Sequence, residues 1–257
     1  IHVVQLAGRD PAAFTDGVRV AEAAGAHIVD INMGGPAKRV TNGYAGSALM
    51  READLALRIV EASVRAASVP VTLKMRLGWD AASLNAPEIA RRAEAAGVRL
   101  VTIHGRTRCQ FYKGAADWSA IRRVKEAVSV PVAANGDLLR PQDAPAMLRA
   151  SGADAVMIGR GAYGQPWIVG QTGALLAGAT PRPAPAGEAL LEHVLEHYEM
   201  LLQHYGLGQG ARIARKHLGW YLERSAASAP VALRQAILTS TDPVQVRRLL
   251  RAVLSDC

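Results

Sequence analysis

Short aliphatic runs alternate with stretches of helical periodicity over the first two thirds of the chain. The runs are rich in β-branched residues and predict six buried strands. These strands are expected at residues 3–7, 28–32, 69–75, 100–104, 130–135 and 155–158. Ala-, Arg- and Glu-rich segments between them predict amphipathic helices at 12–24, 52–67, 87–96 and 118–127. This alternation indicates a parallel sheet with both faces covered.

The pattern changes after residue 178. Residues 179–187 are rich in proline and predict an extended linker. Beyond the linker no strand pattern is found, and amphipathic periodicity predicts helices at 188–205, 210–224, 230–238 and 243–254. We therefore expect a strand–helix domain over 1–178, a linker over 179–187 and a small helical domain over 188–257.

Six strand–helix units fit two architectures. One is an open doubly wound sheet, but no Gly-x-Gly-x-x-Gly follows a predicted strand, so a dinucleotide site of the Rossmann type has no support. The other is a (β/α)₈ barrel, which fits if two further units precede Ile1. The repeat length alone does not choose between them.

Composition narrows the functional class. Half of the 257 residues are hydrophobic, which excludes a disordered chain, and no apolar run reaches the ~18 residues of a membrane span. With two cysteines and no charged-then-apolar leader, we expect a cytoplasmic protein without disulfides or metal. We also expect a monomer. A net charge of +8 favours a polyanionic partner.

Polar residues follow five consecutive predicted strands, where parallel α/β folds place their functional groups. They include Asn32, Lys74, His104, the Asn135-Gly136-Asp137 run and the Gly159-Arg160 pair. Glycines and an arginine after the last two strands predict a phosphorylated cofactor or substrate. The alternatives are a surface lysine, a buried structural histidine and ordinary tight turns.

Cations and aromatic residues share several predicted loops and one predicted helix. Arg212, Arg215 and Lys216 lie on one helical face, which is either a solvated surface or a nucleic-acid contact. The loop residues are Lys38, Arg39, Tyr44, Arg106, Arg108, Phe111, Tyr112, Lys113 and Trp118. Cations that bind a nucleic-acid backbone, together with nearby aromatic rings that stack on a base, suit the recognition of an unstacked base. Metal-ligand spacing, a Gly-x-Ser-x-Gly elbow and a P-loop are not found in the sequence.

Seven ordered motifs resemble the bacterial tRNA-dihydrouridine synthases, in particular their B-type, NifR-like branch. The motifs are Asp-Ile-Asn-Met-Gly-Gly-Pro-Ala-Lys-Arg-Val (30–40), Ala-Gly-Ser-Ala-Leu (45–49), Val-Thr-Leu-Lys-Met-Arg (71–76), Thr-Ile-His-Gly-Arg-Thr-Arg (102–108), Ala-Asn-Gly-Asp (134–137), Met-Ile-Gly-Arg (157–160) and Ala-Arg-Ile-Ala-Arg-Lys-His (211–217). The resemblance spans essentially the whole chain. It implies an α/β fold with a TIM (β/α)₈-type barrel, of which six of eight units are present in this chain, followed by a small helical domain that binds tRNA.

The resemblance also implies an oxidoreductase that uses FMN, reduced by NADPH, to convert a uridine of tRNA into dihydrouridine. Gln5 and Lys74 would contact the flavin ring, with His104 beside it. Asn32 and Arg106 would face the uridine. The ribityl phosphate would be bound by Asn135, Gly136, Asp137, Gly159 and Arg160, and tRNA by Arg212, Arg215 and Lys216.

The chain departs from the family pattern in two places. The family motif Asn-x-Gly-Cys-Pro carries a proton-donating cysteine, and this sequence has Gly35 at that position. The family's first two strands, with their Pro-Met-Ala flavin loop, would precede Ile1. Three hypotheses follow: a synthase without the motif cysteine, a cysteine-less homologue that binds flavin and RNA but catalyses another reaction or none, and a small-molecule FMN oxidoreductase of the dihydroorotate dehydrogenase or ene-reductase kind. The basic helical domain disfavours the third.

Overall fold

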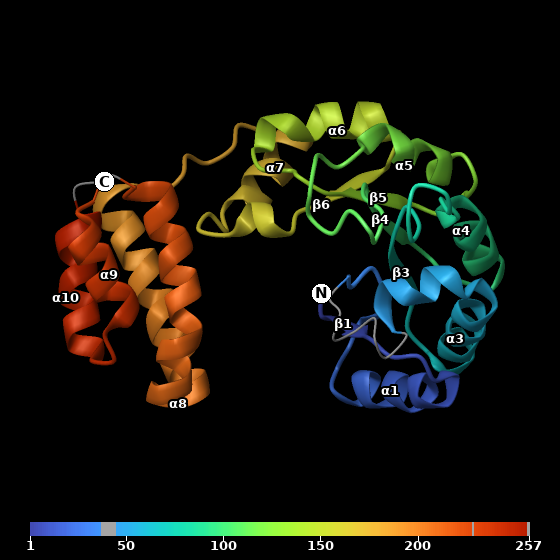
Figure 1. Cartoon of the computed structure of the whole chain (residues 1–257), viewed down its shortest axis with the longest axis horizontal. Coiled ribbons are helices and arrows are strands. Elements are labelled where there is room, and N and C mark those ends of the chain that lie inside the picture. The colour runs from blue at the N-terminus through green and yellow to red at the C-terminus, as the bar shows by residue number, and fades with distance from the viewer. Residues whose placement is uncertain (37–44, 228, 256–257) are drawn as a thin grey trace. The chain divides into compact units, whose positions relative to one another are not determined.

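The computed structural model describes residues 1–36, 45–227 and 229–255. Within them, six strands form one parallel sheet whose spatial order follows the sequence (Figure 1). The strands are β1 (Val3–Leu6), β2 (Ile28–Met33), β3 (Val71–Arg76), β4 (Val101–His104), β5 (Val132–Asn135) and β6 (Ala155–Met157). All six predicted strands are confirmed, with ends that shift by two residues or fewer.

Helical segments connect consecutive strands. They are α1 (Pro11–Ala23), the 3₁₀ turn η1 (Gly46–Arg51), α3 (Ala53–Ala66), α4 (Ala86–Ala95), α5 (Trp118–Lys125), η2 (Pro141–Asp143) and α6 (Ala144–Ser151). The strand order never reverses, so there is no topological switch point of the doubly wound kind. Right-handed crossovers of this order place every helix on the same face of the sheet. The predicted (β/α)₈-type fold class is confirmed, and the expectation of helices on both faces is wrong.

The two faces of the sheet differ in chemistry because side chains alternate along each strand. Ile31, Leu73 and Ile103 point toward the helices and are fully buried in one apolar core. The alternate positions carry polar side chains, and the parallel register aligns them: Asp30 pairs with Thr72, and Asn32 pairs with Lys74. The second face of the sheet is therefore a polar surface at the carboxyl ends of the strands.

The rest of the described chain is helical. It comprises η3 (Arg160–Ala162), α7 (Ile168–Leu176), α8 (Gly187–Ser225), α9 (Val231–Thr239) and α10 (Pro243–Leu254). Helix α8 is interrupted at Gly206, which has a φ of 74° and a ψ of 165°, so the two helices predicted there are both present. Side chains of α8, α9 and α10 form a separate apolar core that includes Leu191, Leu218 and Leu250.

The backbone contacts divide the chain into two compact units. The first contains residues 1–138 and 142–159, and the second contains 139–141 and 160–257. The second unit thus includes the loop after β6 and helix α7 as well as the C-terminal helices. The domain boundaries at 178 and 187 stay a prediction. No helix of the described chain combines the length and the apolar character needed to cross a membrane.

Candidate functional site

A chain of hydrogen bonds crosses the first three strands on the polar face. The Thr72 hydroxyl and the Gln5 amide each donate to Asp30, at 2.6 Å in both cases. Asn32 Nδ2 donates in turn to the Gln5 carbonyl oxygen at 2.8 Å. Both ends of the Gln5 amide are therefore oriented by neighbours. Asp30 orients the Gln5 amide, and Thr72 in turn donates to Asp30. Neither residue received a role from the sequence, although their alternation with apolar residues was a usable signal.

Asn32 also shapes the loop that follows β2. Its Oδ1 accepts from the backbone N–H groups of Gly34 and Gly35, each at 2.9 Å. The Gly35 carbonyl accepts from the N–H and the hydroxyl of Ser47, at 3.1 and 2.8 Å. The backbone at position 35 is thus fixed from both sides, while the glycine itself offers no side chain for proton transfer.

Two cations follow on β3, and their environments differ. Arg76 is 2% exposed, and its Nε donates to the Gly34 carbonyl at 2.9 Å. Its Nη1 donates to the carbonyls of Thr107 and Phe111 at 2.8 and 2.9 Å, so Arg76 ties the loop after β2 to the loop after β4. Lys74 projects from the same strand onto the polar face. Burial, followed by repulsion from Arg76, lowers the pKa of Lys74.

His104 ends β4 on the same face and is 8% exposed. Its Nδ1 is buried and has no hydrogen-bond partner within the described chain. Burial, with the positive charges of Arg76, Lys74 and Arg106, lowers the pKa of His104 to about 3, so the imidazole is neutral near pH 7. A buried ring nitrogen without a partner, beside a lysine, is an arrangement that a polar ligand would satisfy.

Arg106 and Asp137 form a clamp at the ends of β4 and β5. Arg106 is 2% exposed, and it donates to both carboxylate oxygens of Asp137, at 2.8 and 2.5 Å. The same guanidinium donates to the carbonyls of Lys113 and Gly114. The N–H of Ala116 also donates to Asp137, at 2.8 Å. The structure therefore places these two predicted site residues against each other and against the loop over 113–116.

The remaining predicted residues at strand ends are Asn135, Gly136 and Gly159, and there is open space beside Gly159. Asn135 Nδ2 donates to the Met157 carbonyl at 2.8 Å. Gly136 has a φ of 123°, and a Cβ there would lie 2.7 Å from the Cβ of Ala116, so this position requires glycine. A Cβ on Gly159 would meet only Asn135 Nδ2, at 4.0 Å. Backbone groups beside Gly159 are accordingly accessible to a ligand.

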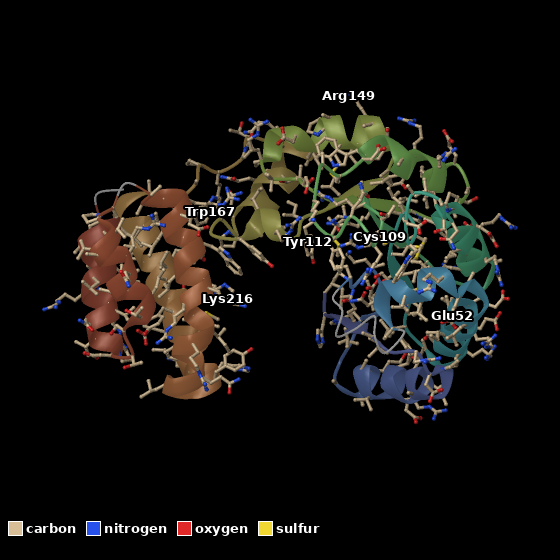
Figure 2. The ribbon with its side chains drawn as sticks, viewed as in Figure 1. Glu52, Cys109, Tyr112, Arg149, Trp167 and Lys216 are labelled. Atoms are coloured by element: carbon tan, nitrogen blue, oxygen red, sulfur yellow. The ribbon has the colours of Figure 1, made fainter. Side chains whose placement is uncertain are left out.

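A ladder of cations and aromatic rings lies on the loops after β3 and β4. The guanidinium of Arg108 lies 4.6 Å from the ring centre of Trp79 and 4.5 Å from that of Phe111. Arg51 contacts Trp79 as well, at 4.8 Å, a contribution that the sequence did not indicate. Tyr112, in the loop after β4, is 52% exposed and lies near the exposed Cys109 of the same loop (Figure 2). Such surfaces suit an unpaired base.

The second unit carries a basic pocket of about 580 Å³ on α8. Its lining comprises Gln209, Arg212, Ile213, Lys216 and His217, and Figure 2 labels Lys216 on this helix. Arg215, predicted to share this surface, instead donates to the Thr239 carbonyl at the end of α9, at 3.1 Å. The structure thus brings together two of the three predicted cations.

The remaining predicted cations and Tyr44 lie in the second unit or outside the described residues. Arg160 begins η3 in the second unit and is exposed. Lys38, Arg39 and Tyr44 lie outside the described residues. No group of three or more His, Cys, Asp or Glu side chains that could hold a metal ion is found within the ranges 1–36, 45–227 and 229–255.

Comparison with known proteins supports one family. The family model described as dihydrouridine synthase matches residues 1–256. A probable tRNA-dihydrouridine synthase of Rhizobium leguminosarum bv. phaseoli is 56% identical over 245 residues, which cover 95% of this chain and 75% of that protein. The tRNA-dihydrouridine synthase B of Xanthomonas campestris pv. campestris is 49% identical over 226 residues, covering 88% of this chain and 68% of that protein.

Solved structures give a weaker likeness. A mandelate racemase/muconate lactonizing family protein from Azoarcus sp. EbN1 aligns with a TM-score of 0.48 and 20% identity, over 70% of this chain and 42% of that chain. A score at this level supports no functional conclusion. The family model, in contrast, matches nearly every residue of the chain. This match shows that the chain belongs to the dihydrouridine synthase family.

Proposed function

We propose that this protein is a tRNA-dihydrouridine synthase that reduces uridine in tRNA, with FMN as its cofactor and NADPH as the reductant. The family match and the printed names of its relatives support the reaction. The structural observation that carries the cofactor proposal is the unpartnered, buried Nδ1 of His104 beside Lys74. Because the proposed substrate is tRNA, the location that we propose is the cytoplasm.

The residues on the polar face fit a phosphorylated flavin. An orphaned ring nitrogen, a lysine without an ion-pair partner in the described chain and open backbone at Gly159 are suited to a polar, anionic group. We assign Gln5 and Lys74 to the flavin ring and His104 to a place beside it. Asn135, Gly136, Asp137, Gly159 and Arg160 are assigned to the ribityl phosphate. Asp137 contributes through the loop that it holds with Arg106, because a second anion beside a phosphate would be repelled.

Bound FMN would deliver a hydride to the uracil ring after its own reduction by NADPH. The chain's own residues would bind the cofactor and orient the uridine. Asn32 fixes the loop that carries position 35, and Arg106 fixes the loop after β4, so both act on the uridine site through the backbone that they hold. Lys74 supplies positive charge beside the ring. Arg212 and Lys216 provide cations for tRNA phosphates.

Gly35 limits this reaction because no proton donor occupies the family's cysteine position. A positioned general acid contributes roughly 10²–10⁴-fold to a rate. This observation favours a second candidate, a cysteine-less homologue that binds flavin and RNA but catalyses another reaction or none. A small-molecule flavin oxidoreductase is a weaker alternative, because the basic pocket on α8 would then have no use.

The decisive experiment compares Gly35 with Gly35→Cys. We expect both proteins to bind flavin, and the cysteine variant to form dihydrouridine in tRNA roughly 10²–10⁴-fold faster, because the thiol restores the general acid. NADPH-dependent dihydrouridine formation in tRNA is the measurement. Gly35→Ala is the matched control, since it adds a Cβ without a proton donor. Absence of dihydrouridine from both proteins, despite bound flavin, would contradict the synthase and support the second candidate.

The cofactor assignment has its own test in Lys74→Ala. Removing this ammonium from the polar face should weaken flavin retention, because a charge near the ring is lost from a partly desolvated site. The flavin absorbance per mole of purified protein measures the effect. Lys125→Ala removes a lysine of the same unit that pairs with Asp154 at 2.8 Å, and it should leave retention unchanged. Full flavin content in Lys74→Ala would show that the assignment is wrong.

A further inference from the structure

The basic pocket on the second half of α8 leads along the helix into a stack of aromatic rings. The residues that line the pocket recur every three or four positions, so they share one face of the helix. They are Gln209, Arg212, Ile213, Lys216 and His217. Trp220 follows on this face, and its ring lies 5.2 Å from that of His217, edge to face. Lys216 and Trp220 are four positions apart, or about 6 Å along the helix axis.

Tyr163 extends the aromatic part of this face. It comes from the segment after β6, which belongs to the same compact unit as α8, and it stacks on Trp220 with ring centres 3.8 Å apart and planes 8° apart. This spacing approaches the ~3.4 Å rise between stacked nucleotides. Tyr163 is 42% exposed although Trp220 covers one face of its ring, so solvent reaches the face that points away from Trp220. A planar ligand can therefore add one further layer to the stack.

The Tyr163 ring is held in place by backbone contacts with α8. Arg224, one turn after Trp220, donates from Nε to the Tyr163 carbonyl at 2.7 Å. Gly164 has a φ of +67°, and a Cβ at this position would collide with the Trp220 carbonyl oxygen, so only glycine allows the approach. A ring that is already fixed loses little conformational entropy when a ligand stacks on it.

The charge beside the stack favours an anionic ligand. None of the five residues that line the pocket is acidic, and two of them, Arg212 and Lys216, are exposed cations. Burial lowers the pKa of His217, so its imidazole is neutral near pH 7 and adds a ring to the pocket instead of a charge. Cations beside an accessible ring suit a chain in which phosphates alternate with planar bases. Bases of a duplex are already stacked on one another, so the ring requires unpaired ones.

We propose that this face of α8, together with Tyr163, binds an unpaired segment of RNA: Arg212 and Lys216 bind its phosphates, and the Tyr163 ring stacks on one of its bases. The proposal rests on the proposed function, which makes tRNA the partner of these two cations. It adds that the helical unit contacts unpaired nucleotides and not the duplex backbone alone. Since every base has a planar face, the contact distinguishes unpaired from paired nucleotides and tolerates any base.

The stacking contact can be isolated by removing either of its two partners. The first probe is a fluorescein-labelled oligouridylate of about eight nucleotides, and the second is the same sugar–phosphate chain without bases. Fluorescence anisotropy at about 50 mM salt gives the Kd of each probe for the whole chain. All proteins in this comparison carry Trp79→Ala and Tyr112→Ala, so that rings of the first unit do not mask the effect. Circular dichroism verifies that each variant keeps its helices.

Tyr163→Ala should raise the Kd for the oligouridylate about 5- to 150-fold, the range for loss of one base–aromatic stack. It should leave the Kd for the abasic chain unchanged, because that probe has no base to stack. Tyr163→Phe keeps the ring and should bind both probes as tightly as the protein with Tyr163. Tyr205→Ala is the matched control: Tyr205 is 44% exposed on α8, but it precedes the break at Gly206 and does not line the pocket.

The outcomes separate this proposal from the proposed function. Lys216→Ala should weaken both probes alike, and tRNA as well, because all three carry phosphates. If Lys216→Ala changes none of them, the tRNA assignment of this helix fails, and the stacking proposal with it. If Lys216→Ala weakens binding but Tyr163→Ala does not, the stacking proposal alone is overturned. Equal losses of both probes in Tyr163→Ala would also overturn it, because the ring would then support the pocket without touching a base.

Discussion

The cations of the two compact units serve opposite purposes. In the first unit, Arg76 and Arg106 are each 2% exposed and donate to carbonyl or carboxylate oxygens of neighbouring loops. In the second unit, Arg212 and Lys216 are exposed and line an open pocket of about 580 Å³. The first pair holds backbone in place, and the second pair is accessible to a polyanion.

Burial therefore decides what a positive charge can do. A buried guanidinium cannot turn to a substrate without leaving several carbonyl groups unpaired, and each unpaired group costs about 1–3 kcal/mol. An exposed cation gives up only hydration and counterions, and binding to a phosphate chain releases those counterions. Residue type alone, which is all that a sequence shows, does not distinguish these two cases.

The largest effect that this comparison predicts is on the stability of the first unit. Arg106→Ala should lower the free energy of unfolding by roughly 3–5 kcal/mol, because it removes the buried half of the ion pair with Asp137 and leaves two loop carbonyls without the guanidinium donor. Urea denaturation followed by circular dichroism measures the change. Arg212→Ala on the second unit is the control and should stay within about 0.5 kcal/mol.

A different result would restore the role that the sequence suggested for Arg106. If Arg106→Ala keeps the stability of the parent protein while dihydrouridine formation falls, the guanidinium faces the uridine and does not primarily hold the loop. The exposed ion pair of Arg65 with Glu61 at 3.7 Å provides a second reference, since removing it should cost about 0–1 kcal/mol.

The same contrast explains which features were predictable from the sequence. Strand and helix positions follow from local periodicity, and this is why all six strands and the four C-terminal helices were found. Only some residues of the polar face were predicted from the sequence. Polar residues at strand ends were noted, but no role was given to Asp30 and Thr72, which lie inside strands and alternate with apolar neighbours.

Partnerships between distant residues were not predictable. Arg106 and Asp137 are 31 positions apart, and they meet because β4 and β5 are neighbours in the sheet and because Gly136 turns the chain at a positive φ. Arg215 and Lys216 are adjacent, yet only Lys216 lines the pocket, since packing of α9 against α8 occupies Arg215. Both distinctions depend on tertiary contacts that periodicity does not encode.

A smaller effect concerns pH and the buried imidazole of the first unit. The pKa of His104 is lowered to about 3 in the folded protein, against an ordinary value near 6.5 when the chain is unfolded. Between these values the unfolded chain binds the proton that the folded chain excludes. The stability contributed by the neutral imidazole is therefore complete above about pH 6.5 and falls as the pH drops toward 3, by at most about 1.4 kcal/mol per pH unit.

His104→Asn tests this because it removes the titrating group and keeps a polar side chain. The variant should lose less stability than the parent protein between pH 6.5 and pH 4.5, as measured by urea denaturation at each pH. His204→Asn on the exposed surface of the second unit is the control and should retain the parent's pH dependence. Identical pH profiles for His104→Asn and the parent would contradict the lowered pKa.

The smallest effect concerns the exposed cations, and it is visible in salt dependence. If Lys216 neutralises one phosphate of tRNA, Lys216→Ala should reduce the slope of log K against log salt concentration by about 0.7–0.9, with only a modest loss of affinity at physiological salt. Filter binding of tRNA from 50 to 300 mM salt, a range chosen to include physiological ionic strength, measures the slope. Arg215→Ala is the matched control on the same helix, because its guanidinium donates to the Thr239 carbonyl and does not line the pocket. The control should leave the slope unchanged. Equal slopes for all three proteins would show that the pocket on α8 is a solvated surface, and that RNA is bound by the cations and rings of the first unit.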